Sequence, residues 1–310
     1  LLYWTTGNPA PDWNGDARLG DNLFSDSVLA LNPDTGERVW YYQFTPHDVW
    51  DYDGNSHLFQ ADLEENGQTI KALVQANRNG FFYAINRTNG EFIRATSYME
   101  QLNWADSMEP NGRPVVNPDA MPNEEPTFRI CPGVFGGMNG SVSGSLNPEL
   151  GLAFIPVIES CQLMQKGISM HVEGQLFFGG LPIPVDLEPN EEGEWPAYGH
   201  ISAVDYSTGD IAWRYYDPQP MMAGTLSTAG GLVFTGSQTG HALGLNAETG
   251  DVVWRKRLGS GIRSQPIAYE LDGDAYVAIA SGNFGSIAGL AGGDVSIPEG
   301  GQLYVFKIDN

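Results

Sequence analysis

A short pattern of residues occurs three times in the chain, and it restricts the fold more than any other feature of the sequence. It consists of a small residue, an Asp or Asn two positions later, a Thr-Gly turn and a Trp four positions after the glycine. The three copies cover residues 30–40, 203–213 and 244–254. A fourth copy, residues 84–94, keeps the Ala, Asn and Gly but ends in Arg94. Each copy predicts two strands joined by a tight turn that ends on a glycine.

The spacing of the copies indicates larger repeating units. The turn glycines Gly209 and Gly250 lie 41 residues apart, and Gly36 and Gly90 lie 54 residues apart. Repeats of roughly this length are typical of β-propellers, whose blades are four-stranded antiparallel sheets. We expect each Trp to fill the gap between neighbouring blades. Unrelated hairpins with the same turn chemistry are the alternative, which the repeated match at several positions disfavours.

The composition agrees with a fold made of strands. The 39 Gly and 20 Pro residues would interrupt helices every few residues. No apolar stripe with a helical period reaches the length of a helix, and short apolar runs lie between turns instead, as at residues 80–85, 152–157 and 275–280. Hydrophobic residues make up 41% of the chain, which is enough for a large core. We therefore predict an all-β protein built of propeller blades.

The charge of the chain disfavours two classes of partner. There are 15 Lys and Arg residues against 38 Asp and Glu residues, which gives a net charge of -23. Nucleic acids and anionic membranes would be repelled by such a surface. No apolar run approaches the roughly 20 residues of a membrane-spanning helix. We expect neither nucleic-acid binding nor a membrane span.

The two cysteines, Cys131 and Cys161, are separated by 30 positions. In an exported protein they would form a disulfide within one blade, which would stabilise the fold by about 3 kcal/mol through loop entropy. They lack the closely spaced partners that a zinc site needs. Two unpaired buried thiols are the alternative.

Residues 45–54 are rich in polar groups that a propeller core does not require. This segment holds three Asp residues and one His, and Asp51 and Asp53 would point to the same side of an extended segment. Asn8 lies in a rigid Gly-Asn-Pro turn. Two carboxylates and an amide oxygen suit a hard cation that prefers oxygen ligands. The alternative is a connecting loop in which the Asp residues cap turns.

Several blocks of the sequence, in order and at similar spacing, resemble the dehydrogenases of alcohols and methanol that depend on pyrroloquinoline quinone (PQQ). These blocks are residues 4–11, 20–23, 45–52, 76–80 and 226–234. The resemblance runs over residues 1–310 and implies an eight-bladed propeller with PQQ near its axis, above a metal ion. It also implies that this chain is the C-terminal part of a single propeller domain, with about four to five blades recognisable from the repeats.

The resemblance assigns roles to individual residues. Asn8 would be a metal ligand, and Asp51 would be both a metal ligand and the catalytic base that takes the hydroxyl proton of the alcohol. Arg78 would hydrogen-bond to the quinone oxygens, where its fork of donors stabilises negative charge. Asn139 would make a polar contact with the cofactor. The metal would act as a Lewis acid while hydride passes from a primary alcohol, which leaves as an aldehyde.

Asp53 refines the prediction for the metal. An Asp two residues beyond the catalytic Asp resembles the lanthanide-dependent members, whereas calcium-dependent methanol dehydrogenases tend to have a small neutral residue there. A trivalent ion gains more from one further carboxylate, so we favour a lanthanide over Ca²⁺ as the metal. The alternative role for Asp53 is a hydrogen-bond acceptor in the turn before Gly54.

Parts of the family pattern do not occur in this chain. There is no pair of adjacent cysteines and no Cys-x-x-Cys-His haem motif. Residues 1–7 read as a strand and lack the features of a signal peptide. We therefore expect an N-terminal half of the propeller, or a second chain that replaces it, and a separate soluble cytochrome c as electron acceptor. The family, and a disulfide at the spacing of Cys131 and Cys161, imply a periplasmic protein.

Two other functions remain open at this point. A propeller of this kind can be a non-catalytic scaffold or binding protein, but a scaffold has no need of Asn8, Asp51 and Arg78 together. A PQQ-dependent sugar or polyol dehydrogenase would share the same residues and differ in its pocket walls. A homodimer is a further association that the sequence neither requires nor excludes.

Overall fold

The computed structural model describes the whole chain except residues 66, 139–141, 184–196, 284–299 and 309–310. In the described residues, regular structure consists of strands β1 to β22 and two short 3-10 helices, η1 (Gly15–Ala17) and η2 (Pro118–Ala120). The prediction of an all-β chain is therefore confirmed. None of the helices in this part of the chain is long and apolar enough to cross a membrane.

The chain divides into two compact units. The first comprises Leu1–Gly140 and Ser160–Val185, and the second comprises Ser141–Glu159 and Asp186–Asn310. Each sheet belongs entirely to one unit or the other, and all paired strands within the sheets are antiparallel.

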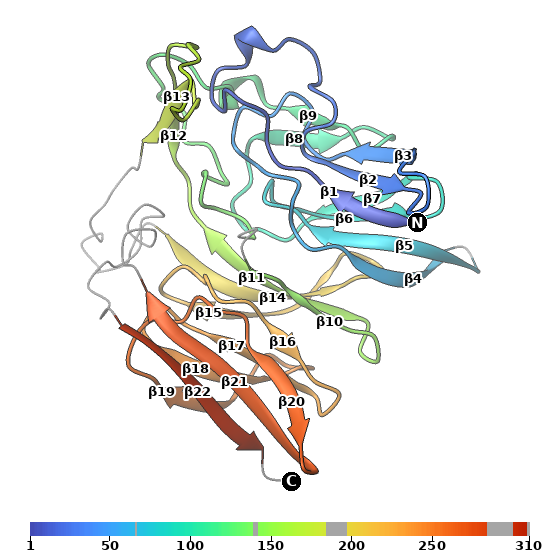
Figure 1. Ribbon diagram of the computed structural model, residues 1–310, viewed down its shortest axis with the longest axis vertical. Coiled ribbons are helices and arrows are strands. Elements are labelled where there is room, and N and C mark those ends of the chain that lie inside the picture. The colour runs from blue at the N-terminus through green and yellow to red at the C-terminus, as the bar shows by residue number, and fades with distance from the viewer. Residues whose placement is uncertain (66, 139–141, 184–196, 284–299, 309–310) are drawn as a thin grey trace. The chain divides into compact units, whose positions relative to one another are not determined.

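The first unit contains two blade-like sheets and two small hairpins. One sheet has the order β1-β2-β3 and the other β4-β5-β6-β7, and the hairpins are β8-β9 and β12-β13 (Figure 1). The strands are β1 (Leu2–Thr5), β2 (Ser27–Leu31), β3 (Arg38–Gln43), β4 (Phe59–Glu65), β5 (Gln68–Ala76), β6 (Phe81–Asn86), β7 (Phe92–Ser97), β8 (Ala105–Met108), β9 (Pro114–Val116), β12 (Leu163–Lys166) and β13 (Gly180–Ile183).

The second unit contains three sheets, of which two have four strands. Their orders are β10-β11-β14-β15, β16-β17-β18-β19 and β20-β21-β22. The strands are β10 (Ser145–Asn147), β11 (Leu152–Glu159), β14 (Tyr198–Asp205), β15 (Ile211–Asp217), β16 (Leu226–Ser227), β17 (Leu232–Gly236), β18 (His241–Asn246), β19 (Val252–Arg257), β20 (Ile267–Leu271), β21 (Asp274–Asn283) and β22 (Gly300–Ile308).

The four copies of the sequence pattern adopt the same local structure. Each copy forms the last hairpin of its sheet, and the strand register shifts in each just after the small residue. The side chain of the Asp or Asn accepts a hydrogen bond from the backbone two residues later, at 2.7 to 2.9 Å. The turn glycine has a positive φ of 75 to 84°. The copy at residues 84–94, which lacks the Trp, is therefore a full structural repeat.

Two of the three tryptophans, Trp40 and Trp213, pack as the repeats predict, against the turn of the next copy in their own unit. A Cβ atom on Gly90 would lie 2.7 Å from the Trp40 ring, and one on Gly250 would lie 2.5 Å from the Trp213 ring. The indole N–H of Trp213 also donates to the carbonyl of Ala247, at 3.0 Å. A glycine is required at these two positions both by its φ and by the approach of the ring.

Cys131 and Cys161 form a disulfide within the first unit, so the alternative of two free thiols is wrong. The bond connects two segments beside the aromatic core of that unit, which contains the fully buried side chains of Trp50, Tyr52 and Trp104. This core supports the loop that carries the polar residues at positions 48–53.

Candidate active site

The loop after β3 is organised by a buried carboxylate. Asp48 is fully buried, and its two oxygens accept hydrogen bonds from the backbone N–H groups of Trp50 and Tyr52, each at 2.8 Å. These bonds hold a tight turn in which Asp51 and Asp53 have positive φ values of 65° and 26°. Non-glycine residues in that region are uncommon and often occur at functional sites.

The aromatic residues of the same loop are anchored in the core. The indole N–H of Trp50 donates to the carbonyl of Ala120 at 2.7 Å, and the hydroxyl of Tyr52 donates to the carbonyl of Pro132 at 2.8 Å. The two rings are stacked, with centroids 5.7 Å apart. Because Trp50 and Tyr52 are anchored in the core, Asp51 and Asp53 remain partly exposed, with side-chain exposures of 22% and 20%.

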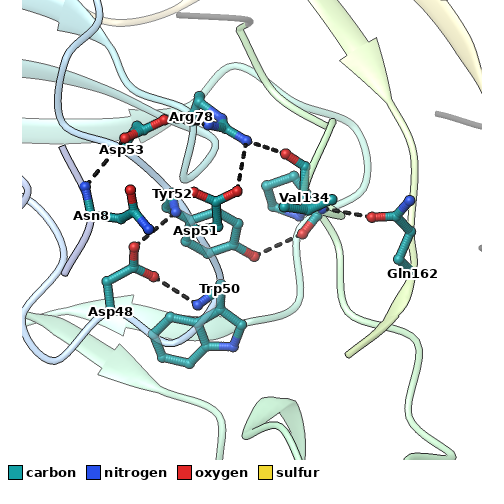
Figure 2. A network of polar contacts seen from close by, with 10 residues as sticks. Asn8, Asp48, Trp50, Asp51, Tyr52, Asp53, Arg78, Val134 and Gln162 are labelled. Atoms are coloured by element: carbon teal, nitrogen blue, oxygen red, sulfur yellow. Dashed lines mark hydrogen bonds and ion pairs between the residues drawn. The ribbon is translucent and has the colours of Figure 1, made fainter. Parts of the chain in front are cut away.

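Asn8 joins this site through the backbone. Its N–H donates to one carboxylate oxygen of Asp53, at 3.2 Å (Figure 2). The preceding Gly7 allows this approach, because a Cβ atom there would lie 2.7 Å from the same oxygen. The nearby side-chain amide of Asn8 lowers the pKa of the Asp12 carboxyl group, although burial raises it more.

Arg78 lies beside both carboxylates, in the turn between β5 and β6. Its guanidinium donates to Asp53 and to the carbonyl of Val134, and one of its nitrogens is 3.8 Å from a carboxylate oxygen of Asp51 (Figure 2). The turn is fixed by its two asparagines. The backbone N–H of Asn79 donates to the side chain of Asn77 at 3.0 Å, and the side chain of Asn79 donates to Tyr83 at 2.9 Å.

Burial and mutual repulsion raise the pKa values of the acidic groups. The pKa of Asp51 is raised to about 8, mainly by burial; Arg78 lowers it and Asp53 raises it again. The pKa values of Asp12 and Asp48 are each raised to about 6, again mainly by burial. A bound cation would favour the charged form of these groups, because opposite charge stabilises a carboxylate.

The structure brings together four of the residues predicted for the site, namely Asn8, Asp51, Asp53 and Arg78. Asn139 lies outside the described residues. Among the described residues, no three or more His, Cys, Asp and Glu side chains are already arranged to hold a metal ion. Arg78 pairs with an oxygen of Asp53, so a cation bound there would share this carboxylate with Arg78.

The donor groups nevertheless fit a hard cation. All the side-chain atoms proposed as metal ligands are oxygens. The two oxygens of the buried Asp26 carboxylate have no hydrogen-bond partner. Sequence reasoning missed Asp12 and Asp26 as members of this acidic cluster, and it counted Asp48 among the three Asp residues of the segment without giving it a role. The order Asp-x-Trp-x-Tyr at residues 48–52 could have revealed that role, because Asp often accepts a hydrogen bond from the backbone two residues later.

Comparison with known proteins shows which family the chain belongs to. Residues 1–103 match the family model "Glucose/ethanol/alcohol dehydrogenase, beta-propeller domain", and residues 197–294 match that of "Outer membrane protein assembly factor BamB". The quinoprotein alcohol dehydrogenase PedH of Pseudomonas putida is 37% identical over 99% of this chain. The chain belongs to the PQQ-dependent alcohol dehydrogenase family.

Two further similar proteins are methanol dehydrogenases that are named for a metal. The lanthanide-dependent methanol dehydrogenase of Methylacidiphilum fumariolicum is 32% identical over 100% of the chain. A solved europium-containing methanol dehydrogenase superposes with a TM-score of 0.87 at 31% identity, over 99% of this chain and 57% of the other. The predicted propeller architecture is thereby confirmed. The chain spans about half the length of these curated relatives, 52% of PedH and 54% of the methanol dehydrogenase.

Proposed function

We propose that the protein containing this chain oxidises a primary alcohol to an aldehyde, with PQQ as its bound electron acceptor. The observation that carries the proposal is the grouping of Asn8, Asp51, Asp53 and Arg78 in one partly buried site. The match of the chain to quinoprotein alcohol dehydrogenases supports the same activity. Residues 1–310 would then be the C-terminal part of one propeller domain, completed by an N-terminal half or a second chain.

Each residue of the grouping has a distinct role in this proposal. Asn8, Asp51 and Asp53 hold the metal ion through their oxygens, and Arg78 and Asn139 bind PQQ. When bound, PQQ and its metal supply an electrophilic carbonyl that accepts a hydride. Asp51 takes the hydroxyl proton of the alcohol on a carboxylate oxygen, and the positive charge of Arg78 stabilises the negative charge that develops beside it.

We favour a lanthanide over Ca²⁺ as the metal, since the site combines several carboxylates in a partly buried position. The names of two similar proteins, a lanthanide-dependent and a europium-containing methanol dehydrogenase, support this choice. We further propose a separate cytochrome c as electron acceptor and a periplasmic location. A relative from Thauera butanivorans, 36% identical over 85% of the chain, is named a 1-butanol dehydrogenase (cytochrome c).

The Asp51→Asn variant tests the proposed activity. Asn keeps the size of the side chain but cannot take the hydroxyl proton, so turnover should fall by about a hundredfold or more. The Asp62→Asn variant is the matched control, because the Asp62 side chain is 59% exposed. Circular dichroism should show that both variants are folded. Unchanged turnover in Asp51→Asn would contradict the proposed base.

A non-catalytic scaffold is the second candidate function. The match of residues 197–294 to the BamB family model favours it, since that family is named for an assembly factor. The acidic site speaks against it, because a scaffold gains nothing from partly buried carboxylates beside an arginine. A PQQ-dependent sugar or polyol dehydrogenase would use the same residues, and it is distinguished by comparing turnover of ethanol, glucose and glycerol.

A further inference from the structure

Asp26 lies between the two loops that carry the proposed metal ligands. Its backbone N–H donates to the carbonyl of Gly7 at 3.0 Å, next to Asn8. A Cβ atom on Gly54, next to Asp53, would lie 2.7 Å from the carbonyl carbon of Asp26. Asp26 is therefore held in direct contact with the neighbours of two proposed ligands.

The carboxylate of Asp26 is buried and has no hydrogen-bond partner. The residue is 0% exposed, and neither carboxylate oxygen accepts a hydrogen bond of acceptable geometry. Burial of a carboxyl group without a partner is strongly unfavourable, so such a group needs a specific reason to be present.

The positively charged side chain nearest in effect, Arg18, does not form a hydrogen bond with the carboxylate of Asp26. Arg18 interacts electrostatically with Asp26 and with the acidic groups around it. However, its donors bond to the side chain of Asn22 and to the backbone carbonyls of Pro11, Asp12 and Asp48. The carboxylate of Asp26 is therefore left available to another positive charge.

The electrostatic neighbours of Asp26 are the acidic residues of the candidate site. Burial raises the pKa of Asp26 well above its usual value, and the charges of Asp48, Asp53 and Asp51 raise it further. The backbone N–H of Gly54 lowers this pKa, but it is not aligned for a hydrogen bond with either oxygen. A cation bound by Asp51 and Asp53 would thus also act on the charge of Asp26.

We propose that Asp26 is a further acidic residue of the cation site, and that its buried charge increases the preference of the site for a trivalent over a divalent ion. The attraction between a fixed negative charge and an ion grows with the charge of the ion, and it is strong where water is excluded. Asp26 acts on the metal ion by electrostatic attraction and needs no direct bond to it. This inference rests on the metal site proposed above.

A purely structural role for Asp26 makes a different prediction. Its φ is 45°, a region that Asn tolerates about as well as Asp. The Asp26→Asn variant therefore keeps the backbone conformation and the shape of the side chain, but it cannot become negatively charged when a cation binds. If Asp26 contributes charge to cation binding, this variant should be about as stable as the wild type without metal, because one buried polar group without a hydrogen-bond partner replaces another.

The experiment uses the intact protein, freed of metal by a chelator. Thermal denaturation measures the metal-free stability, and isothermal titration with La³⁺ and with Ca²⁺ measures the two affinities. In Asp26→Asn the La³⁺ affinity should fall about tenfold more than the Ca²⁺ affinity, with no loss of metal-free stability. Asp62→Asn, at an exposed carboxylate, should change neither quantity. Asp53→Asn should also weaken La³⁺ binding, since it removes a proposed ligand.

Each of the other outcomes overturns the inference. An unchanged ratio of La³⁺ to Ca²⁺ affinity in Asp26→Asn would show that its charge does not select the ion. A loss of metal-free stability, or failure of the variant to fold, would show that Asp26 is structural. If the wild-type protein takes up neither ion, the proposed metal site fails as well.

Discussion

Asp51 and Asp53 owe their position to the residues that alternate with them. The side chains of Trp50 and Tyr52 donate hydrogen bonds to carbonyls of the core, and the carboxylate of Asp48 accepts hydrogen bonds from the backbone of the same turn. Sequence reasoning predicted that the two carboxylates would lie together, but it expected an extended segment, and this part of the prediction is wrong because both residues have positive φ values in a tight turn. It did not predict Asp26, because the contacts of that residue with Gly7 and Gly54 join segments far apart in the sequence.

Replacing Arg78 by Lys should impair catalysis more than folding. Lys carries one charged group and cannot span Asp51, Asp53 and the carbonyl of Val134 as the guanidinium does. We expect kcat to fall by about a hundredfold. The matched control is Arg113→Lys, since the Arg113 side chain is 43% exposed in its pair with Asp21. Steady-state kinetics with both variants tests the prediction, and equal activities would contradict it.

The raised pKa of Asp51 makes the stability of the metal-free protein depend on pH. Its pKa rises from 3.8 to about 8 on folding, so the folded state holds a proton that the unfolded state releases at lower pH. Stability should therefore fall as the pH rises from about 4 to about 8, and the raised pKa values of Asp12 and Asp48 act in the same direction.

Urea denaturation at about pH 5.5 and about pH 8.5 measures this dependence. The metal-free wild type should be less stable at the higher pH, and the Asp51→Asn variant should show a smaller difference. A wild-type protein that becomes more stable as the pH rises over this range would contradict the assignment of these carboxyl groups as buried.

The repeated hairpins are the elements that sequence reasoning predicted best. Their pattern is local, so the turn, the glycine and the tryptophan contact all follow from residues within one copy or the next. The register shift after the small residue was not predicted, since it depends on how the strands pair. The copy that ends in Arg94 keeps the same turn, which indicates that the Asn and Gly determine the hairpin.

Substitution of a glycine that contacts a tryptophan ring should cost more stability than substitution of a glycine that is required only for its positive φ. Gly250 and Gly273 have similar φ values of 79° and 84°. A Cβ atom on Gly250 would lie 2.5 Å from Trp213, whereas one on Gly273 would meet nothing within 4 Å. We expect Gly273→Ala to cost about 1 kcal/mol and Gly250→Ala about 2 to 3 kcal/mol, measured by urea denaturation. Equal losses would show that the tryptophan contact is unimportant.

The disulfide should stabilise the first unit mainly through the unfolded chain. Cys131 and Cys161 are separated by 30 positions, for which loop entropy gives about 3 to 4 kcal/mol. The Cys131→Ser, Cys161→Ser double variant should lose stability by about this amount in urea denaturation. A double variant as stable as the wild type would indicate that the folded segments are held by their other contacts alone.

At the scale of the whole molecule, the account rests on a site that collects carboxylates from several loops. The chain has a net charge of -23, and in its first unit five Asp residues interact electrostatically around Arg78 and Arg18. Sequence resemblance predicted the residues of this site, but the mutual effects of their charges required the three-dimensional structure. The metal should therefore matter for stability as well as for activity.

Metal removal tests this view directly. Added La³⁺ should raise the melting temperature of the chelator-treated wild-type protein, because the ion binds the folded state and relieves repulsion among the carboxylates. The Asp53→Asn variant should show a smaller increase. If La³⁺ leaves the melting temperature of the wild type unchanged, the acidic site is not a cation site.

The measurement that tests the central claim most directly is dye-coupled oxidation of ethanol and methanol by the intact protein supplied with PQQ and either La³⁺ or Ca²⁺. We predict formation of the aldehyde with PQQ present, and faster turnover with La³⁺ than with Ca²⁺. Turnover with Ca²⁺ alone would keep the alcohol dehydrogenase and contradict the role of Asp53. Absence of turnover with either ion would contradict the proposed enzyme and favour the scaffold.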